Sequence, residues 1–302
     1  MVYPYCILFL LCLSLGLATK NIYTTKKPEI KSLERHKTMN NDNQKQTNAW
    51  LTYINNVTAT KTVGQLTTSD KLGEPVTLEW HKTNMLTPSF ASLMQKVSDM
   101  GVAAFMNVEM QFLKTFPEVV GVEPYFKPFE PLFKDGLEAV DWQKVEQTMQ
   151  AMIKGHFTID ITKFSDEMIK AFSPAIFLCV TARNPETGSL LGYVTFFIQP
   201  NFAYGTVKVT GIAVDPSVQG RGLAKLLLSS LFAVLPETER IFLCTRVTNT
   251  TALKAYAACG FTKDENPTQE PHHVFDLNHW TFMEYKAEQS SILQKVTKTL
   301  AN

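Results

Sequence analysis

A glycine-bearing loop between a strand pattern and a helix pattern is the part of this sequence best suited to hold a phosphate group. Residues 208–231 read KVTGIAVDPSVQGRGLAKLLLSSL: a β-branched run, an Asp-Pro break at 215–216, the loop QGRG at 219–222, and a leucine-rich helix pattern from Leu223. Backbone N–H groups at a helix start have no intrahelical partner and lie at the positive end of the helix dipole, so a loop without bulky side chains lets a phosphate approach them. We therefore predict a pyrophosphate-binding loop here.

The spacing of the glycines excludes two common classes of phosphate-binding loop. The loop contains neither the G-x-x-x-x-G-K-[ST] of a Walker loop nor the G-x-G-x-x-G of a dinucleotide-binding fold. Its pattern Gln219-x-x-Gly222-x-Ala224 resembles the [RQ]-x-x-G-x-[GA] acetyl-CoA signature of the GCN5-related N-acetyltransferases, the GNAT family. A second block at 249–261, NTTALKAYAACGF, resembles motif B of that family, N-x-x-A-x-x-x-Y followed by G-F. The resemblance is specific over about 175–286, whereas residues 76–174 agree with the family only in the order of their elements.

The resemblance implies a reaction and a set of cofactor contacts. It implies acetyl-CoA as co-substrate and transfer of its acetyl group to an amine of a small molecule or a protein. The backbone of 212–214 would pair with the pantetheine arm and hydrogen-bond the acetyl oxygen, and the loop amides would hold the pyrophosphate. Arg221 could add charge there, although an exposed loop arginine often contributes nothing specific. The residues placed at the cofactor in this way are Ile212, Ala213, Val214, Gln219, Gly220, Arg221, Gly222, Leu223, Ala224 and Asn249.

Tyr256 is the candidate catalytic residue. It occupies the position where the family places a tyrosine near the CoA sulfur, as a general acid or an orienting group. A phenol with a pKa near 10 is protonated at neutral pH, so it is in the correct state to donate a proton. The alternative is a helix tyrosine that fills the core. Asn249, at the start of the same helix, could cap the helix, contact the cofactor, or do both.

The general base is missing from its expected place. Many relatives carry a glutamate on the strand that precedes the loop, where this sequence has Lys208 and Thr210. Either another carboxylate serves, with Glu109, Asp276 and Glu284 as candidates, or the amine arrives neutral. The alternative function is a catalytically silent CoA-binding or regulatory module.

The fold class that the resemblance implies is α/β, with a mixed, mostly antiparallel sheet flanked by helices and splayed between its two central parallel strands. Apolar and β-branched runs predict strands at 76–80, 175–182, 190–199, 207–214, 240–247 and 279–286. Helical spacing predicts a long helix from about residue 90, which Gly101 divides, and a second helix at 141–154 with Asp141 as N-cap and Gly155 as stop.

Prolines and aromatic residues alternate at 123–133, EPYFKPFEPLF, which argues against a regular helix or a central strand. In the family, substrates enter near the early helices and the loop between them. Tyr125, Phe126 and Phe129 are therefore candidates for an acceptor pocket; the alternative is a loop whose rings pack on the core.

The sequence divides into four parts. Residues 1–18 form an apolar leader, either a signal peptide or short anchor, or the product of a mis-set translation start, with Met39 as a later start. Residues 19–75 are polar and predict a flexible linker. We expect the acetyltransferase domain at 76–286, with its core match at 175–286, and a polar tail or helix at 287–302.

Composition limits the partners. The formal net charge of +1 gives no broad field for nucleic acid or an acidic membrane, so we expect a membrane contact only through residues 1–18, while a homodimer is compatible with the sequence. The cysteines of the domain lack framework spacing and predict free thiols in a reducing compartment, hence a cytoplasmic domain; export or tethering by the leader is the alternative. His272, His273 and His279 lack partners at metal-ligand spacing, and we expect no metal site.

Overall fold

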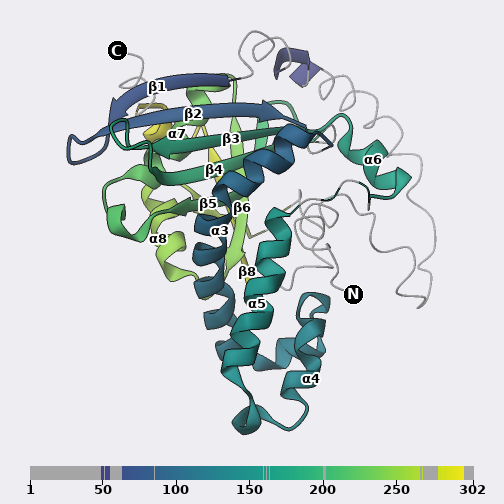
Figure 1. The fold of residues 1–302 in the computed structure, drawn as a ribbon. Helices are drawn as coiled ribbons and strands as arrows, with labels where there is room; N and C mark the ends of the chain where they lie inside the picture. Colours follow the sequence, from purple (N-terminus) through teal and green to yellow (C-terminus); the bar gives the residue numbers. More distant parts are fainter. Residues whose placement is uncertain are drawn as a thin grey trace.

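The fold is an eight-stranded sheet with helices on both faces (Figure 1). The computed structural model describes residues 49–295, except 51, 55–62, 85, 159, 161, 163, 200–201, 266 and 268–277. The strand order is β1-β2-β3-β4-β5-β6-β8-β7, and every neighbouring pair is antiparallel except β5 and β6. The strands are β1 Val63–Ser69, β2 Pro75–Thr83, β3 Ile176–Arg183, β4 Leu190–Ile198, β5 Thr206–Val214, β6 Arg240–Arg246, β7 Thr262–Lys263 and β8 Trp280–Lys286. The predicted fold class is confirmed.

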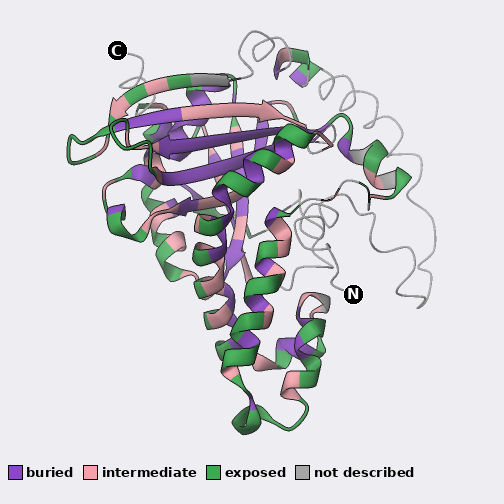
Figure 2. Ribbon diagram, viewed as in Figure 1, coloured by how far each residue is buried: buried purple, intermediate pink, exposed green. Residues whose placement is uncertain are grey.

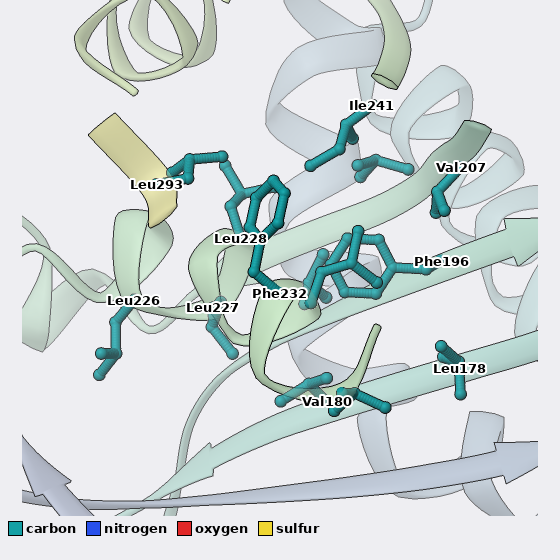
Figure 3. Packing of buried hydrophobic residues seen from close by; sticks show 14 of the residues in the cluster. Leu178, Val180, Phe196, Val207, Leu226, Leu227, Leu228, Phe232, Ile241 and Leu293 are labelled. Carbon is teal, nitrogen blue, oxygen red and sulfur yellow. The ribbon is translucent and has the colours of Figure 1, made fainter. Parts of the chain in front are cut away.

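The sheet separates two hydrophobic cores. One face packs against α7 (Leu223–Val234) and α8 (Thr250–Ala258), and Figure 3 shows α7 leucines meeting Leu178, Val180 and Phe196 of the strands. The other face packs against α3 (Pro88–Thr115) and α5 (Trp142–Phe157). The central strands β3 and β4 are therefore buried on both sides (Figure 2), which is why they read as nearly continuous apolar runs.

Short helical elements complete the second layer. They are η2 (Pro117–Gly121), η3 (Pro124–Phe129), α4 (Glu130–Phe133), η4 (Leu137–Ala139) and α6 (Asp166–Phe172). A further short element, η6 (Pro216–Val218), precedes the phosphate loop and packs with Val218 on the α7-side core. The segment at 123–133 thus forms no long helix and no strand, as predicted, but it is built of short helical turns. No helix in the part of the chain that the structure describes combines the length and apolarity needed to cross a membrane.

The long helix α3 runs without interruption through Gly101, so the predicted division at this glycine is wrong. A Cβ atom at residue 101 would lie 2.1 Å from Cζ of Phe157 and 2.6 Å from Oη of Tyr193. Glycine is therefore needed here because it lets α5 and β4 approach α3 closely. The stabilisation from this packing exceeds the destabilisation caused by the weak helix propensity of glycine. In α5 the predicted N-cap is confirmed, because Asp141 accepts a hydrogen bond from Lys144 N at 3.1 Å. The helix ends at Phe157, two residues beyond the predicted stop at Gly155.

Part of the predicted linker is folded, and that prediction is corrected. Within 19–75, residues 63–69 form β1, which pairs with β2 along its whole length, and residues 49–50 and 52–54 are helical. Trp50 is fully buried, and its indole N–H donates to the carbonyl of Thr206 at 3.3 Å. At the other boundary, Leu293 is also buried in the α7-side core, so residues beyond 286 pack onto the domain. The predicted leader, Met39 and the adjacent His272 and His273 lie outside the described residues.

Candidate functional site

The parallel pair β5 and β6 separates before either strand ends. The two strands are bridged only where residues 206–208 meet residues 240–242. Beyond Lys208, β5 continues to Val214 as a partner of β4, and beyond Phe242, β6 continues to Arg246 as a partner of β8. Residues 209–214 and 243–246 therefore present facing backbone edges that do not pair with each other. This opening, which we call the splay, was expected from the sequence and is confirmed.

A β-bulge on β5 lies at the splay. Thr195 pairs with Gly211 and Phe196 with Val209, so Thr210 is the extra residue. The bulge inverts the alternation of side chains. Val209 before it and Ile212 and Val214 after it all pack toward the α7-side core, whereas Ala213 is buried toward α3 and α5. Gly211 faces α3, where Phe105 Cζ would lie 3.8 Å from a Cβ atom placed on this glycine. The three residues predicted to meet the acetyl arm thus lie on the open edge, beyond the bulge.

The predicted phosphate loop leads from β5 into α7. Gly220 and Gly222 have φ angles of +79° and +82°, a left-handed conformation that glycine adopts without strain. The first amide of α7 with a backbone acceptor is that of Leu226, which donates to Gly222 O at 3.0 Å. The amides of residues 223–225 precede it in the first turn of α7 and have no acceptor within the helix. The loop therefore offers a row of N–H donors at a helix N-terminus, the arrangement that binds anions.

The side chains of this loop are held by neighbouring segments. Gln219 donates from Nε2 to the carbonyl of Val214 at 3.2 Å. Arg221 forms an ion pair through Nε with the carboxylate of Asp70, which lies in the turn between β1 and β2. Burial opposes ionisation of Asp70, but hydrogen bonds from Arg221 and from the amides of Leu72 and Glu74 hold its pKa below its usual value. The Arg221 charge is therefore offset by a carboxylate.

Helix α8 places Asn249 and Tyr256 beside β6. Asn249 caps the helix, accepting from Ala252 N at 3.3 Å and donating to the Thr245 hydroxyl at 2.9 Å. The capping role is confirmed, and the cofactor contact stays a prediction. Tyr256 is 7% exposed and packs against Phe261 with ring centroids 5.8 Å apart. Burial raises the pKa of Tyr256, as do Cys244 and Cys259, so the phenol is protonated at neutral pH.

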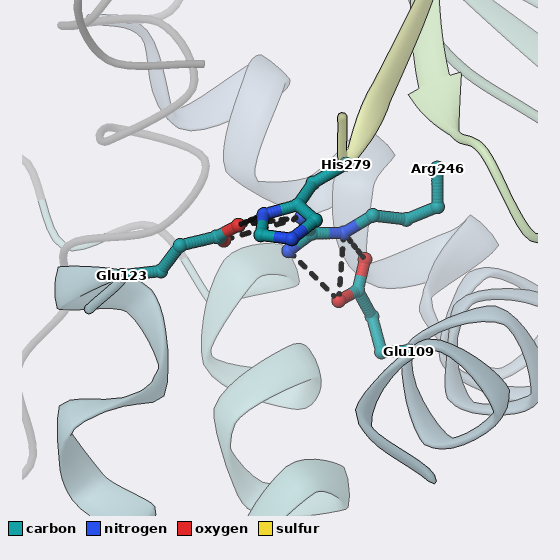
Figure 4. Close-up of polar contacts among 4 residues, drawn as sticks. All are labelled: Glu109, Glu123, Arg246 and His279. Atoms are coloured by element: carbon teal, nitrogen blue, oxygen red, sulfur yellow. Dashed lines mark hydrogen bonds and ion pairs between the residues drawn. The ribbon is translucent and has the colours of Figure 1, made fainter. Parts of the chain in front are cut away.

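At the far end of β6, four polar residues form what we call the Arg246 cluster: Glu109, Glu123, Arg246 and His279 (Figure 4). Glu109, from α3, contacts the guanidinium at Nε (3.3 Å) and Nη2 (3.2 Å), and Glu123, which precedes η3, contacts Nη1 at 3.2 Å. Nδ1 of His279 lies 2.8 Å from the Glu123 carboxylate. The cluster joins β6, α3 and the loop before β8.

Aromatic rings enclose the guanidinium of Arg246. Its Cζ lies 3.9 Å from the ring centroid of Phe112 and 4.0 Å from that of Trp280, and the rings of Tyr125 and Phe126 are within 6 Å. Arg246 is 2% exposed. Sequence reasoning missed this cluster, although an arginine at the end of the largely apolar strand RIFLCTR is a signal of a buried ion pair.

The two candidate bases that the structure describes lie at opposite ends of the splay. Glu109 lies at its open end, beside the last residue of β6, where burial raises its pKa while Arg246 acts in the opposite direction. Glu284 lies at the closed end, opposite Phe242 on β8, and pairs with Arg240 (2.8 Å) and Lys286 (2.6 Å). These partners outweigh burial and lower the pKa of Glu284. Asp276 lies outside the described residues.

The aromatic residues proposed for an acceptor pocket belong to the core on the α3 side. Phe126 and Phe129 are fully buried, and Phe126 stacks against Phe112 at 5.8 Å. Tyr125 is half-buried and packs on the same cluster. The structure therefore supports the alternative in which these rings pack on the core.

The buried side chain of Lys208 points to the same α3 side of β5 as Ala213, because the bulge lies between them.

Comparison with known proteins shows a family match in the middle of the chain. Residues 142–261 match the model of the acetyltransferase (GNAT) family. Similar solved structures include the ribosomal-protein-S18-alanine N-acetyltransferase of Escherichia coli, 20% identical over 36% of this chain and 68% of that chain, with a TM-score of 0.28. Another is the spermidine N-acetyltransferase of Vibrio cholerae in complex with CoA and spermine, 22% identical over 37% of this chain and 67% of that chain, with a TM-score of 0.30. No curated protein sequence matches the chain significantly.

Residues 142–261 thus match the GNAT acetyltransferases, the class of acyltransferase that takes its acyl group from acetyl-CoA. The family match runs from the start of α5 to Phe261 and includes the splay, the phosphate loop and α8. It does not include β1, β2, α3 or β8. Asp70 lies in the turn between β1 and β2, Glu109 lies in α3, and Trp280, which packs on the guanidinium of Arg246, begins β8.

Proposed function

We propose that this chain is an acetyl-CoA-dependent N-acetyltransferase that transfers the acetyl group to an amine of a small molecule or a protein. The observation that carries the proposal is the continuity of the β5 edge at 209–214, which does not pair with β6, with the first-turn amides of α7 at 223–225, which have no acceptor within the helix. An extended pantetheine arm can add to that edge as a further strand would, while its pyrophosphate meets the amides at the start of α7.

In this arrangement the reacting atoms meet in the splay. The amine nitrogen attacks the acetyl carbon, the C–S bond breaks, and the CoA thiolate takes a proton. An N–H on the open edge of β5 would stabilise the negative charge that develops on the acetyl oxygen. Tyr256, protonated and beside β6, would donate the proton to the sulfur. Glu109 is the candidate that receives the amine proton, because it lies at the open end of the splay.

A second candidate function is a CoA-binding module without transferase activity. It is favoured by the presence of Lys208 and Thr210 where relatives carry a glutamate, and by the pairing of Glu109 with Arg246. Such a module would bind acetyl-CoA but release no thiol with any amine.

Thiol release from acetyl-CoA, measured against polyamines, small amines, amino acids and peptides with free N-termini, tests the proposal. We expect turnover with at least one amine class. Tyr256→Phe should then lower kcat by about a hundredfold with little change in CoA affinity, because only proton donation is removed. Tyr204→Phe is the matched control and should keep full activity. Tyr204 precedes β5, and the change removes a hydroxyl that donates a hydrogen bond to the carboxylate of Glu237. Binding without turnover favours the second candidate, and unchanged kcat in Tyr256→Phe overturns the role of this tyrosine.

A further inference from the structure

We propose that the turn between β1 and β2 is part of the cofactor site, with Lys71 as a ligand for a phosphate of acetyl-CoA and Asp70 as a positioning residue for Arg221. The inference rests on the proposed binding of acetyl-CoA at the start of α7. It adds residues that lie outside the family match and in a segment whose composition predicts only a linker.

The turn is fixed to the phosphate loop by two contacts. The backbone N–H of Lys71 donates to the carbonyl of Arg221 at 2.9 Å, and the Asp70 carboxylate pairs with the guanidinium of the same residue. The turn is also rigid in itself, because Oδ1 of Asp70 accepts from Leu72 N at 2.8 Å and from Glu74 N at 3.1 Å. The 69–74 segment therefore holds a constant position relative to the amides of the loop.

Lys71 starts beside the N-cap residue of α7. A Cβ atom on Gly222 would lie 3.4 Å from Cβ of Lys71, and apart from the adjoining residues no other heavy atom of the described part of the chain would lie within 4 Å. The lysine is exposed, and its ammonium makes no hydrogen bond or ion pair with any residue that the structure describes. A flexible four-carbon stem rooted here can place the ammonium over the row of amides at 223–225.

The charges around the loop indicate that Lys71 can contribute to the binding of an anionic ligand. Asp70 offsets the charge of Arg221, so the cations left to face an anionic ligand at this loop are Lys225, in the first turn of α7, and Lys71. Lys71 adds a second positive charge at the place where phosphate is expected. Asp70 in turn keeps the Arg221 side chain at the turn. A Cβ placed on Gly220 would have no atom of a described residue within 4 Å, its chain neighbours aside, so the space there is open.

The test is calorimetric titration of the full chain and its variants with CoA at low ionic strength. Lys71→Gln should weaken CoA binding about three- to fivefold, as expected for one exposed charge pair, and the difference should shrink as salt is added. Lys71→Arg should bind as the original chain does. Lys134→Gln, an exposed lysine after α4 at the opposite end of the molecule (Figure 1), is the matched control and should bind CoA normally. The melting temperature without ligand should be the same for all four proteins.

A parallel titration with 3′-dephospho-CoA identifies the phosphate. An equal loss for both ligands in Lys71→Gln assigns the lysine to the pyrophosphate, and a loss for CoA alone assigns it to the 3′-phosphate. Equal CoA affinity of Lys71→Gln and the original chain overturns the inference and leaves the proposed function intact. Failure of the original chain to bind CoA overturns the proposed function itself.

Discussion

Replacing Arg246 by methionine is the most direct test of the Arg246 cluster. The change keeps an apolar side chain between Phe112 and Trp280 but removes the charge that faces Glu109 and Glu123, both at 3.2 Å. Removal of one partner from a buried ion pair costs about 3–5 kcal/mol, because the remaining charge has lost its compensation and cannot recover its hydration. Since the arginine is 2% exposed, we expect a loss in this range from the free energy of unfolding near pH 8.

The loss should depend on pH in a definite direction. Burial raises the pKa of Glu109 above its ordinary value of 4.5, and Arg246 opposes this rise. The folded chain therefore keeps a proton on this carboxyl at a pH where the unfolded chain has released it, so stability falls as the pH rises through the folded-state pKa. In Arg246→Met the opposing charge is gone and the folded-state pKa rises further. The destabilisation should be small near pH 5 and grow toward pH 8.

Urea unfolding followed by far-UV circular dichroism at several pH values measures both effects. Arg246→Met combined with Glu109→Gln should recover at least about half of the stability lost at pH 8, because one uncompensated charge is removed with its partner. Arg183→Met is the matched control: its ion pair with Glu79 is partly exposed, and its loss should cost less than about 1 kcal/mol. A loss in Arg246→Met that is equally small, or that does not change with pH, would refute the reasoning.

Two further substitutions test the packing that positions the site. Gly101→Ala should lower the free energy of unfolding by about 1–3 kcal/mol in urea, because its Cβ would overlap the side chains of Phe157 and Tyr193. Adding Phe157→Leu should recover part of this loss. An unaltered urea midpoint for Gly101→Ala alone would show that the contact is not tight. Trp50→Ala should cost about 3–5 kcal/mol by the same measurement, since the indole is fully buried; a cost below about 1 kcal/mol would mean that the segment around Trp50 does not belong to the core.

The elements that carry their own local pattern could be predicted from the sequence. The apolar runs of β3 to β6, the glycine loop and the Asp141 and Asn249 caps all express preferences of a few neighbouring residues. β1 could not be recognised in this way, because the described side chains at 65–69 are exposed or half-buried and mostly polar, with Leu66 the one that packs on the core. The strand is stabilised mainly by pairing with β2.

The parts of the site that join distant segments were beyond local reasoning. Glu109 and Arg246 are 137 residues apart, and Asp70 and Arg221 are 151 residues apart, so no window of sequence contains either pair. Gly101 illustrates the same limit: as a local signal it predicts a helix break, whereas its function depends on Phe157 and Tyr193 from two other elements. The contribution of β1 and α3 to the site became visible only when the sheet order was known.

The strand order also bears on how the domain is built during synthesis. From β1 to β5, each strand pairs antiparallel with the one made just before it in the chain, so this part of the sheet can assemble in the order of translation. β6 is bridged to β5 at three positions only, and its full-length partner β8 is synthesised later than β6, α8 and β7. The two edges that enclose the splay therefore belong to an early and a late assembly unit. A ribosome-bound chain that stops before residue 280 would present the phosphate loop but not the completed opening beside it.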